Sequence, residues 1–382
     1  MLIGLDAIPL TEPRAGVGHY TFELARALAL ASPGDEFELV YPSSYPPIDF
    51  IGDEQLPPNL RLERVRVGAL GRRWFAAGLP RYAGRRGLRL FHGTNYEVPL
   101  WGGAASVLTV HDLSLLVHPE THERRRVRRA RRRLPLMARA ADAVVVPTEA
   151  VRREVCEHLR VPPERVFAVH EAARECFRPA EFSETEEARR ALGVGPEFLL
   201  AVGTIEPRKN LAALVAAFEQ VLRARPESPL QLVVAGGRGW LSEPLFEAVG
   251  RSPARARIVL AGYVTDGQLR ALYSSCRAFV YPSLYEGFGL PPLEAMSCGA
   301  PVLAGRTAAV AEVTAGAARL FDPRDTDALA RELLRLLDDE DAGRALARAG
   351  LARAAHFSWE RTARETLEVY AEALKRTRNS ER

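Results

Sequence analysis

Residues 281–301 have the sequence Tyr281-Pro-Ser-Leu-Tyr-Glu286-Gly-Phe-Gly-Leu-Pro-Pro-Leu-Glu294-Ala-Met-Ser-Cys-Gly-Ala-Pro301. The apolar run before this stretch predicts a strand that ends near Tyr281, and the glycines that follow permit a tight turn. Two adjacent prolines suit the first positions of a short helix, which Gly299 ends and Pro301 prevents from continuing. The stretch therefore predicts a strand, a glycine turn and a helix, the local unit of an α/β fold.

The turn of this unit is suited to an anionic ligand. Backbone N–H groups there point into the crevice beyond the strand, as in phosphate sites, and they come from Gly287, Phe288, Gly289 and Leu290. Glu286 stands before the turn, and Glu294 lies about one turn inside the helix. A carboxylate can accept paired hydrogen bonds from vicinal hydroxyls, so one glutamate could hold a sugar and the other a ribose. An isolated glutamate pair is more often a turn residue and a solvated helix residue, but here the pair accompanies a strand and a glycine turn.

Strand and helix patterns alternate along the whole chain of 382 residues, which is typical of parallel sheets. The strands expected in the first half are Leu2–Leu5, Phe37–Tyr41, Leu88–His92, Ala105–Val110 and Ala143–Val146. Those expected in the second half are Phe198–Val202, Gln231–Ala235, Arg257–Leu260, Ala278–Tyr281 and Pro301–Ala304. Two successive sets in a chain of this length predict two doubly wound, Rossmann-like domains.

The boundary between the domains is expected near residue 180, because Arg178-Pro179 and an acidic stretch interrupt the periodicity there. We therefore expect an N-terminal domain over 1–178 and a C-terminal domain over 179–358. A final helix, about 359–376, is expected to pack back onto the first domain.

A second motif follows the strand expected at Phe198–Val202. It reads Gly203-Thr-Ile-Glu-Pro-Arg208-Lys209-Asn210-Leu211 and leads into a helix over Leu211–Leu222. Of the 52 basic residues only Lys209 and Lys375 are lysines, so a lysine retained in this loop is notable, although two exposed loop cations are the simpler interpretation. Fixed cations at this edge could stabilise the charge on a departing diphosphate.

The first half offers weaker signals. A glycine loop, Arg14-Ala-Gly16-Val-Gly18-His19-Tyr20, precedes a helix expected over Thr21–Leu30, and by itself it is more often a structural turn. His111 and Asp112 end the apolar run before them, again at the carboxyl edge of an expected strand. A lone histidine in such a place is more often structural than catalytic.

Taken together, these motifs resemble the retaining glycosyltransferases of family four, whose signature is a pair of glutamates with seven residues between them. The resemblance extends through Gly262–Leu269, Ala201–Asn210, His111-Asp112 and Phe357–Glu360, and so covers essentially the whole chain. It implies the GT-B fold, in which two Rossmann-like domains face one another across a cleft. It also implies that Glu286 contacts the transferred hexose and Glu294 the nucleotide ribose.

The same resemblance implies further roles. Arg208 and Lys209 would stabilise the diphosphate, His111 would lie beside the reacting sugar with Asp112 as its orienting residue, and the glycine loop would close over the donor. The donor-binding set implied is Gly16, Gly18, Val264, Gly287, Phe288, Gly289, Leu290 and Glu294, with Asp112 and Glu312 in support. Two departures are visible: Thr204 stands where the family usually has arginine, which resembles a subgroup rich in mannosyltransferases, and Ala311 replaces the usual proline before Glu312.

No metal or organic cofactor is expected beyond the nucleotide-sugar substrate. Cys156, Cys176, Cys276 and Cys298 have no metal-ligand spacing. Two Asp-x-Asp strings, at 325–327 and 339–341, lie at the ends of an expected helix, where capping is their simplest role. No segment has the length and apolarity of a membrane span, and the N-terminus does not resemble a signal peptide, so we expect a cytoplasmic protein.

An arginine-dense run, Arg124–Arg133, lies in a helix expected from Glu123 to Ala141, which Pro135 is expected to kink or divide. Its apolar positions keep helical spacing, and arginines cover most of the other face. Three interpretations stay open: a solvated face, peripheral attachment to an anionic membrane, or, least favoured, nucleic-acid binding. No nucleic-acid module accompanies the helix, and no nucleic-acid partner is expected.

The sequence thus predicts a retaining, metal-independent hexosyltransferase that uses a nucleotide diphosphate sugar, for the mannosyltransferase-like subgroup GDP-mannose, in polysaccharide or glycolipid synthesis. One alternative is a nucleotide-sugar hydrolase or epimerase of the same fold, which would turn over without an acceptor. Another is a non-catalytic protein that binds sugar nucleotides. Such a protein could lose any of the catalytic residues, so the presence of all four argues against it: Glu286, Glu294, Lys209 and His111.

Overall fold

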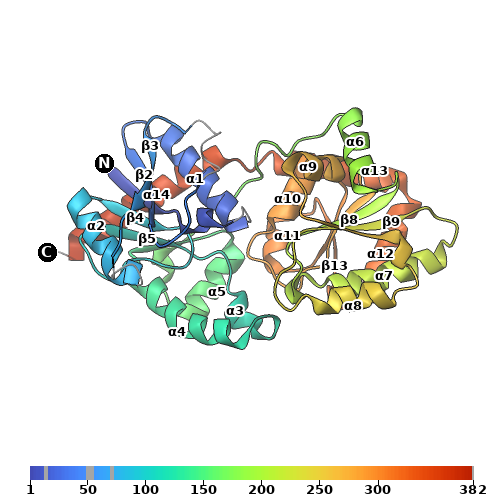
Figure 1. Cartoon of the computed structure of the whole chain (residues 1–382), viewed down its shortest axis with the longest axis horizontal. Coiled ribbons are helices and arrows are strands. Elements are labelled where there is room, and N and C mark those ends of the chain that lie inside the picture. Colours follow the sequence, from blue (N-terminus) through green and yellow to red (C-terminus); the bar gives the residue numbers. More distant parts are fainter. Residues whose placement is uncertain (13–15, 49–55, 69–72, 381–382) are drawn as a thin grey trace. The chain divides into compact units, whose positions relative to one another are not determined.

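The computed structural model describes residues 1–12, 16–48, 56–68 and 73–380. The chain forms two compact units, each containing one parallel sheet (Figure 1). Unit 1 comprises Met1–Leu113, Arg128–Ala172 and Ser358–Arg382, and unit 2 comprises Ser114–Val127 and Ala173–Phe357. The chain therefore enters unit 2 twice, first with Ser114–Val127 and then with Ala173–Phe357, and its last helix belongs to unit 1.

The sheet of unit 1 has the strand order β3-β2-β1-β4-β5-β6-β7, with every pairing parallel. Its strands are β1 (Leu2–Asp6), β2 (Glu36–Pro42), β3 (Leu60–Val65), β4 (Leu90–Gly93), β5 (Ala105–Thr109), β6 (Ala143–Val146) and β7 (Val166–Ala168). Its helices include α1 (Gly16–Ala31), α2 (Leu79–Arg86), α5 (Glu149–Leu159) and α14 (Trp359–Ser380), and most of α4 (Arg124–Ala140). The strand order reverses between β1 and β4, which is where ligands bind in sheets of this type.

Unit 2 has the strand order β10-β9-β8-β11-β12-β13, again entirely parallel. Its strands are β8 (Phe198–Val202), β9 (Gln231–Ala235), β10 (Ile258–Gly262), β11 (Ala278–Tyr281), β12 (Val302–Gly305) and β13 (Arg319–Phe321). Its helices are α3 (Ser114–Val117), α6 (Phe182–Leu192), α7 (Leu211–Ala224), α8 (Glu243–Arg251), α9 (Asp266–Ser275), α10 (Leu290–Ser297), α11 (Ala308–Thr314), α12 (Thr326–Asp338) and α13 (Glu340–Ala354). Here the order reverses between β8 and β11.

The sheet of unit 2 is buried on both faces. Phe198 and Leu200 of β8 belong to one apolar cluster, and Leu199 and Ala201 belong to another. Because successive side chains of a strand point to opposite faces, these two clusters lie on opposite sides of the sheet. This explains why the strand appeared in the sequence as a continuous apolar run rather than an alternating one.

The sequence predicted ten of the strands and missed β3, β7 and β13. All three lie at a sheet edge, where a strand has a single neighbour. The strand β3 alternates apolar and charged residues, whereas β7 and β13 have only three residues each. Edge strands of this kind lack the continuous apolar run that marks a buried strand.

One prediction about a helix was wrong, and of the kink or division expected at Pro135 the division does not occur. The helix α1 begins at Gly16 instead of Thr21, so Gly16 and Gly18 belong to its first turn and not to a loop; Arg14 and Ala15 lie outside the described residues. Gly18 is needed there because a Cβ atom would lie 3.1 Å from the Pro9 carbonyl oxygen. The helix α4 continues through Pro135 without division, because buried residues on both sides of the proline, including Val127, Leu134 and Met137, hold it in place.

The last helix, α14, packs within unit 1 against α1, β5 and β6 (Figure 1). The segment Ser114–Val127, which the sequence analysis placed in the N-terminal domain, belongs by its contacts to unit 2. Within unit 2 it is held by Trp240, whose indole N–H donates to the Thr121 carbonyl oxygen at 2.9 Å and whose ring stacks on His122. The Arg126 guanidinium lies over the same indole ring.

Candidate functional site

The two sequence motifs of unit 2 meet where its strand order reverses. Lys209 follows β8 and Glu286 follows β11, and these two strands are neighbours in the sheet. Because the carboxyl ends of parallel strands lie at one edge, the side chains converge: Lys209 Nζ is 2.6 Å from Glu286 Oε1. Lys209 Nζ also donates to the Tyr281 hydroxyl at 2.8 Å.

Arg208 completes a cluster of charges around Glu286. One of its terminal nitrogens lies 2.8 Å from Glu286 Oε2 and donates to the Tyr285 carbonyl oxygen, and the other lies 2.6 Å from Glu206 Oε1. The short helix Pro207–Lys209 places both cations on this side. Gly203, directly after β8, has a φ of 139°, a backbone conformation that favours glycine.

Burial and charge act against each other in this cluster. Burial raises the pKa of Glu286, but the opposing effect of Arg208 and Lys209 is larger. The resulting pKa is about 2, so the carboxylate is ionised. Burial lowers the pKa of Lys209, and Glu286 opposes that change. The result is a buried set of charges held close to the reversal point of the sheet, where they could be exchanged for the charges of a ligand.

The glycine turn leads into α10 as the sequence predicted. Gly289 is the N-cap of the helix with φ 103°, a conformation that favours glycine, and the helix begins with Leu290 and two prolines. The side chains of Phe288 and Val264 belong to the apolar core of unit 2.

Glu294 is the second carboxylate of the motif. It is half-buried, and it accepts a hydrogen bond from the Tyr273 hydroxyl at 3.4 Å. Its pKa is raised to about 7. Burial is the largest cause, Arg174 acts to lower the pKa, and Asp266 acts to raise it. Arg174 is itself paired with Asp266 through two contacts of 2.5 and 2.8 Å. Glu294 is therefore poised to change its charge near neutral pH, unlike Glu286.

In unit 1, His111 lies just beyond β5. Its Nε2 is 2.8 Å from the Thr94 carbonyl oxygen, which can only accept, so Nε2 carries a hydrogen. Its Nδ1 faces the buried carboxylate of Glu171 at 3.4 Å, and the rings of Tyr20 and Tyr96 contact it edge-on. The carboxylate that lies beside His111 Nδ1 is that of Glu171. The backbone N–H of Asp112 donates to the Tyr96 hydroxyl, which lies 3.3 Å from the Asp112 carbonyl oxygen.

The other residues that the sequence singled out lie in α11 and at helix ends. Glu312 lies in α11, and its carbonyl oxygen accepts from Arg353. Ala311 donates its N–H to the Thr307 carbonyl oxygen, a bond that the family's proline could not make. In the Asp-x-Asp strings, Asp325 and Asp339 accept from backbone N–H groups as helix caps.

Within residues 1–12, 16–48, 56–68 and 73–380, no three acidic, histidine or cysteine side chains gather as a metal site would require. In the same part of the chain, no helix combines the length and apolar character of a membrane span.

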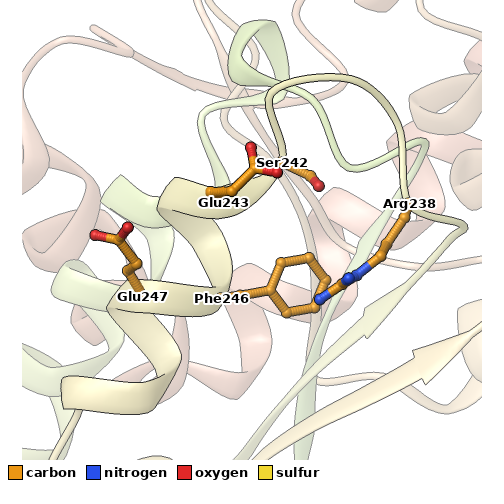
Figure 2. Close-up of a pocket in the computed structure, with 5 residues that line it drawn as sticks. All are labelled: Arg238, Ser242, Glu243, Phe246 and Glu247. Carbon is orange, nitrogen blue, oxygen red and sulfur yellow. The ribbon is translucent and has the colours of Figure 1, made fainter.

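A pocket of about 310 Å³ lies elsewhere in unit 2, along the start of α8 (Figure 2). The Arg238 guanidinium lies 3.8 Å from the centre of the Phe246 ring, and Ser242, Glu243 and Glu247 complete the lining. None of the residues of the glutamate motif or of the Arg208–Lys209 loop lines it, so this pocket is separate from the charge cluster.

The structure therefore brings together Arg208, Lys209 and Glu286, and it places Glu294 on the helix that follows. The sequence did not predict that the two cations pair directly with Glu286, nor that Glu171 faces His111. Glu171 follows β7, and the missed strand was the signal that would have placed it at the same sheet edge as His111.

Comparisons with known proteins agree with this architecture. Residues 182–353 match the family of glycosyl transferases group 1, and residues 14–172 match glycosyltransferase family 4. Over 377 residues the chain is 33% identical to O-antigen chain mannosyltransferase B of Escherichia coli, covering 95% of this chain and 97% of that protein. It is 32% identical over 244 residues to the serotype-specific mannosyltransferase WbdA of Escherichia coli, covering 63% of this chain and 30% of that protein.

Solved structures show the same fold. Sucrose-phosphate synthase of Thermosynechococcus elongatus superposes with a TM-score of 0.77 at 22% identity, covering 97% of this chain and 98% of that one. WaaG, a glycosyltransferase involved in lipopolysaccharide biosynthesis, superposes with a TM-score of 0.73 at 16% identity, covering 97% and 99%. The protein is a glycosyltransferase with the GT-B fold. It belongs to the family-four, group 1 glycosyltransferases.

Proposed function

We propose that the protein is a retaining, metal-independent mannosyltransferase that moves mannose from a nucleotide diphosphate sugar, GDP-mannose, to a hydroxyl of a polysaccharide or lipid-linked acceptor. The observation that carries the proposal is the cluster of Arg208 and Lys209 on Glu286 where the sheet order reverses. The similarity to O-antigen chain mannosyltransferase B over nearly the whole chain supports the choice of mannose.

In this mechanism the cations act on the leaving group. As the glycosidic bond breaks, charge grows on the diphosphate, and preorganised cations stabilise that charge most effectively when water is excluded. Arg208 and Lys209, now held by Glu286, would turn part of their charge toward the diphosphate, with the α10 N-terminus as a further donor. Glu286, relieved of part of its pairing, would accept hydrogen bonds from the sugar hydroxyls, and Glu294 would hold the ribose.

His111 would support positive charge near the reacting carbon, with its ring fixed by the Thr94 carbonyl oxygen. No separate protein base is needed on the acceptor side, because an oxygen of the leaving diphosphate can take the acceptor proton. Bond formation on the face that the leaving group vacates retains the anomeric configuration.

Donor choice can be tested by thermal unfolding with GDP-, UDP-, ADP- and dTDP-sugars. A ligand at 100 times its dissociation constant adds about 2.7 kcal/mol to the free energy of unfolding, so the correct donor should raise the melting temperature clearly. We expect GDP-mannose to give the largest shift. Donor turnover without an acceptor would instead favour a hydrolase or epimerase, and binding without any turnover a non-catalytic protein.

The mechanism predicts that excess EDTA leaves the transfer rate nearly unchanged and that an α-linked donor gives an α-linked product. Proton NMR of the first product formed checks the configuration, and the same assay with and without EDTA checks the metal. A β-anomeric signal from an α donor would refute retention, and a rate restored only by added Mg²⁺ or Mn²⁺ would refute metal independence.

We also propose that α4 binds an anionic membrane surface. Arg125, Arg128 and Arg132 are exposed and have no carboxylate partner among the described residues, whereas Arg129 and Arg133 pair with Glu97. Glu97 ties α4 to the loop that carries Leu100 and Trp101, which are 43% and 54% exposed. A surface that combines an exposed tryptophan with an arginine-rich amphipathic helix is typical of proteins that contact lipid headgroups.

Replacing Arg125, Arg128 and Arg132 with glutamate should therefore weaken binding to vesicles that contain phosphatidylglycerol, since each basic residue near such a surface contributes about 1 kcal/mol. Activity on a soluble acceptor mimic should stay unchanged. A matched control reverses three exposed arginines elsewhere, Arg190, Arg348 and Arg364, and should retain vesicle binding. Equal binding by both variants would leave the arginines of α4 as a solvated face.

A further inference from the structure

A chain of buried polar side chains crosses the core of unit 1 from α14 to α1. The Tyr370 hydroxyl lies 2.7 Å from His92 Nδ1, and His92 Nε2 lies 2.7 Å from Thr109 Oγ1. Thr109 Oγ1 in turn lies 2.9 Å from the Tyr20 hydroxyl. All four residues are at most 3% exposed. They come from four different elements, α14, β4, β5 and α1.

The hydrogen bonds of this chain depend on one another. Burial and then the nearby His111 lower the pKa of His92 to about 3, so at neutral pH its ring carries one hydrogen and has one accepting nitrogen. If Nδ1 holds the hydrogen, Nε2 must accept from Thr109, and Tyr20 must then donate to Thr109. If Nε2 holds it, Thr109 accepts and its own hydrogen becomes available to the Tyr20 oxygen. The bond at Tyr370 therefore influences the orientation of the Tyr20 hydroxyl.

Tyr20 carries this influence to His111. The two rings meet edge-on with their centres 4.7 Å apart and their planes at 90°. The ring of Tyr20 also packs near that of Trp359, a second residue of α14, with the two ring centres 6.1 Å apart. The next residue of α1, Thr21, donates to Thr94 Oγ1, and the Thr94 carbonyl oxygen is the acceptor for His111. A shift of α1 at Tyr20 would thus reach His111 by two routes.

We propose that Tyr370, acting through His92, Thr109 and Tyr20, is a positioning residue that sets the orientation of the His111 ring. The proposal rests on the proposed function, in which His111 lies beside the reacting sugar. Packing alone does not require this arrangement, because apolar side chains of similar size would fill the same space without polar groups that need partners. The polar chain instead specifies one alignment of α14, β4, β5 and α1 around His111.

Removing only the Tyr370 hydroxyl tests the proposal. In Tyr370→Phe we expect kcat to fall on the order of tenfold, less than the roughly 100-fold that a 1 Å misplacement can cause, with the donor KM unchanged. The matched control is Thr366→Val, which removes another fully buried hydroxyl of α14, one that bonds only the Thr362 carbonyl oxygen of its own helix. This control should keep its kcat.

A double-mutant cycle tests the route. If Tyr370 acts through Tyr20, the effect of Tyr370→Phe on kcat should largely disappear in a Tyr20→Phe background. Fully additive effects would contradict the route. Thr109→Val should reproduce the loss from a different element, and Thr109→Ser, which keeps the hydroxyl, should restore activity; these variants also serve if Tyr370→Phe proves too unstable to assay.

A measurement independent of activity separates this proposal from the proposed function. The ¹⁵N resonances of the His111 imidazole should move in Tyr370→Phe and stay in place in Thr366→Val. If the wild-type protein transfers no sugar from any nucleotide donor, the proposed function fails, while the His111 resonances still report on the coupling. Unchanged His111 resonances, or an unchanged kcat in Tyr370→Phe, would overturn the proposal.

Discussion

Lys209→Ala should lower kcat by a factor of about 10² to 10³, the scale on which a single preorganised charge stabiliser acts. The lysine is the cation closest to Glu286, at 2.6 Å, and it lies where β8 and β11 bring the two motifs together. The change should act on kcat at saturating donor, because the charge it stabilises develops only as the bond to the diphosphate breaks. Steady-state kinetics at saturating donor measures the effect.

The chain supplies its own control, since Lys375 is the other lysine. Lys375 is exposed on α14 and pairs with Glu372 at 2.6 Å, so Lys375→Ala should leave kcat unchanged. Melting temperatures of both variants establish that they are folded. An unaltered kcat in Lys209→Ala would remove this residue from the mechanism, even though its pairing with Glu286 would stand.

Glu294→Gln should weaken the binding of free GDP by roughly 10- to 100-fold, because hydrogen bonds to a charged group contribute about 1.5–3 kcal/mol and each 1.4 kcal/mol is tenfold in affinity. Glutamine keeps the shape of the side chain and can still accept from Tyr273, so the fold should be intact. Isothermal titration gives the dissociation constant. An equal constant in the variant and the wild type would show that Glu294 does not hold the ribose.

The pKa of Glu294 adds a pH signature to this prediction. Burial raises the pKa from 4.5 to about 7. Ribose hydroxyls need the ionised carboxylate, so GDP affinity should fall as the pH drops below about 7. The unliganded protein responds to pH in the opposite direction. Because the folded state raises the pKa of Glu294, this group adds to the free energy of unfolding below the pKa of an unfolded glutamate, 4.5, and that contribution is lost as the pH rises through about 7. The melting-temperature increase caused by GDP should therefore grow from pH 6 to pH 8, and much less so in Glu294→Gln.

The strands that carry the site could be predicted because their burial on both faces produces continuous apolar runs. The strands β8, β9 and β11 begin and end at the predicted residues, and the glycine turn before α10 forms as expected. What the sequence could not supply was distance across the sheet. Lys209 and Glu286 are 77 residues apart along the chain, and their 2.6 Å contact depends on β8 and β11 being neighbours.

The errors have a similar origin. Gly16 and Gly18 suggested a loop because glycine is common in loops. The close approach of Gly18 to Pro9 depends on how α1 packs, and this packing is not visible in the local sequence. His92 ends one of the expected strands, and its hydrogen bond to Tyr370 depends on α14 packing against it. Contacts between elements distant in sequence are the part of a site that motifs do not record.

The division of unit 1 across both ends of the chain has a consequence for biosynthesis. All residues of unit 2 leave the ribosome before α14 does, so the domain synthesised second can complete its core first. Until α14 emerges, His92 lacks the partner of its Nδ1 and the faces of α1, β5 and β6 that α14 covers remain exposed. Multidomain proteins commonly fold from the N-terminus as synthesis proceeds, whereas here the N-terminal domain is the last to be completed. A nascent chain that still lacks α14 therefore exposes apolar surface of unit 1 that the finished protein buries.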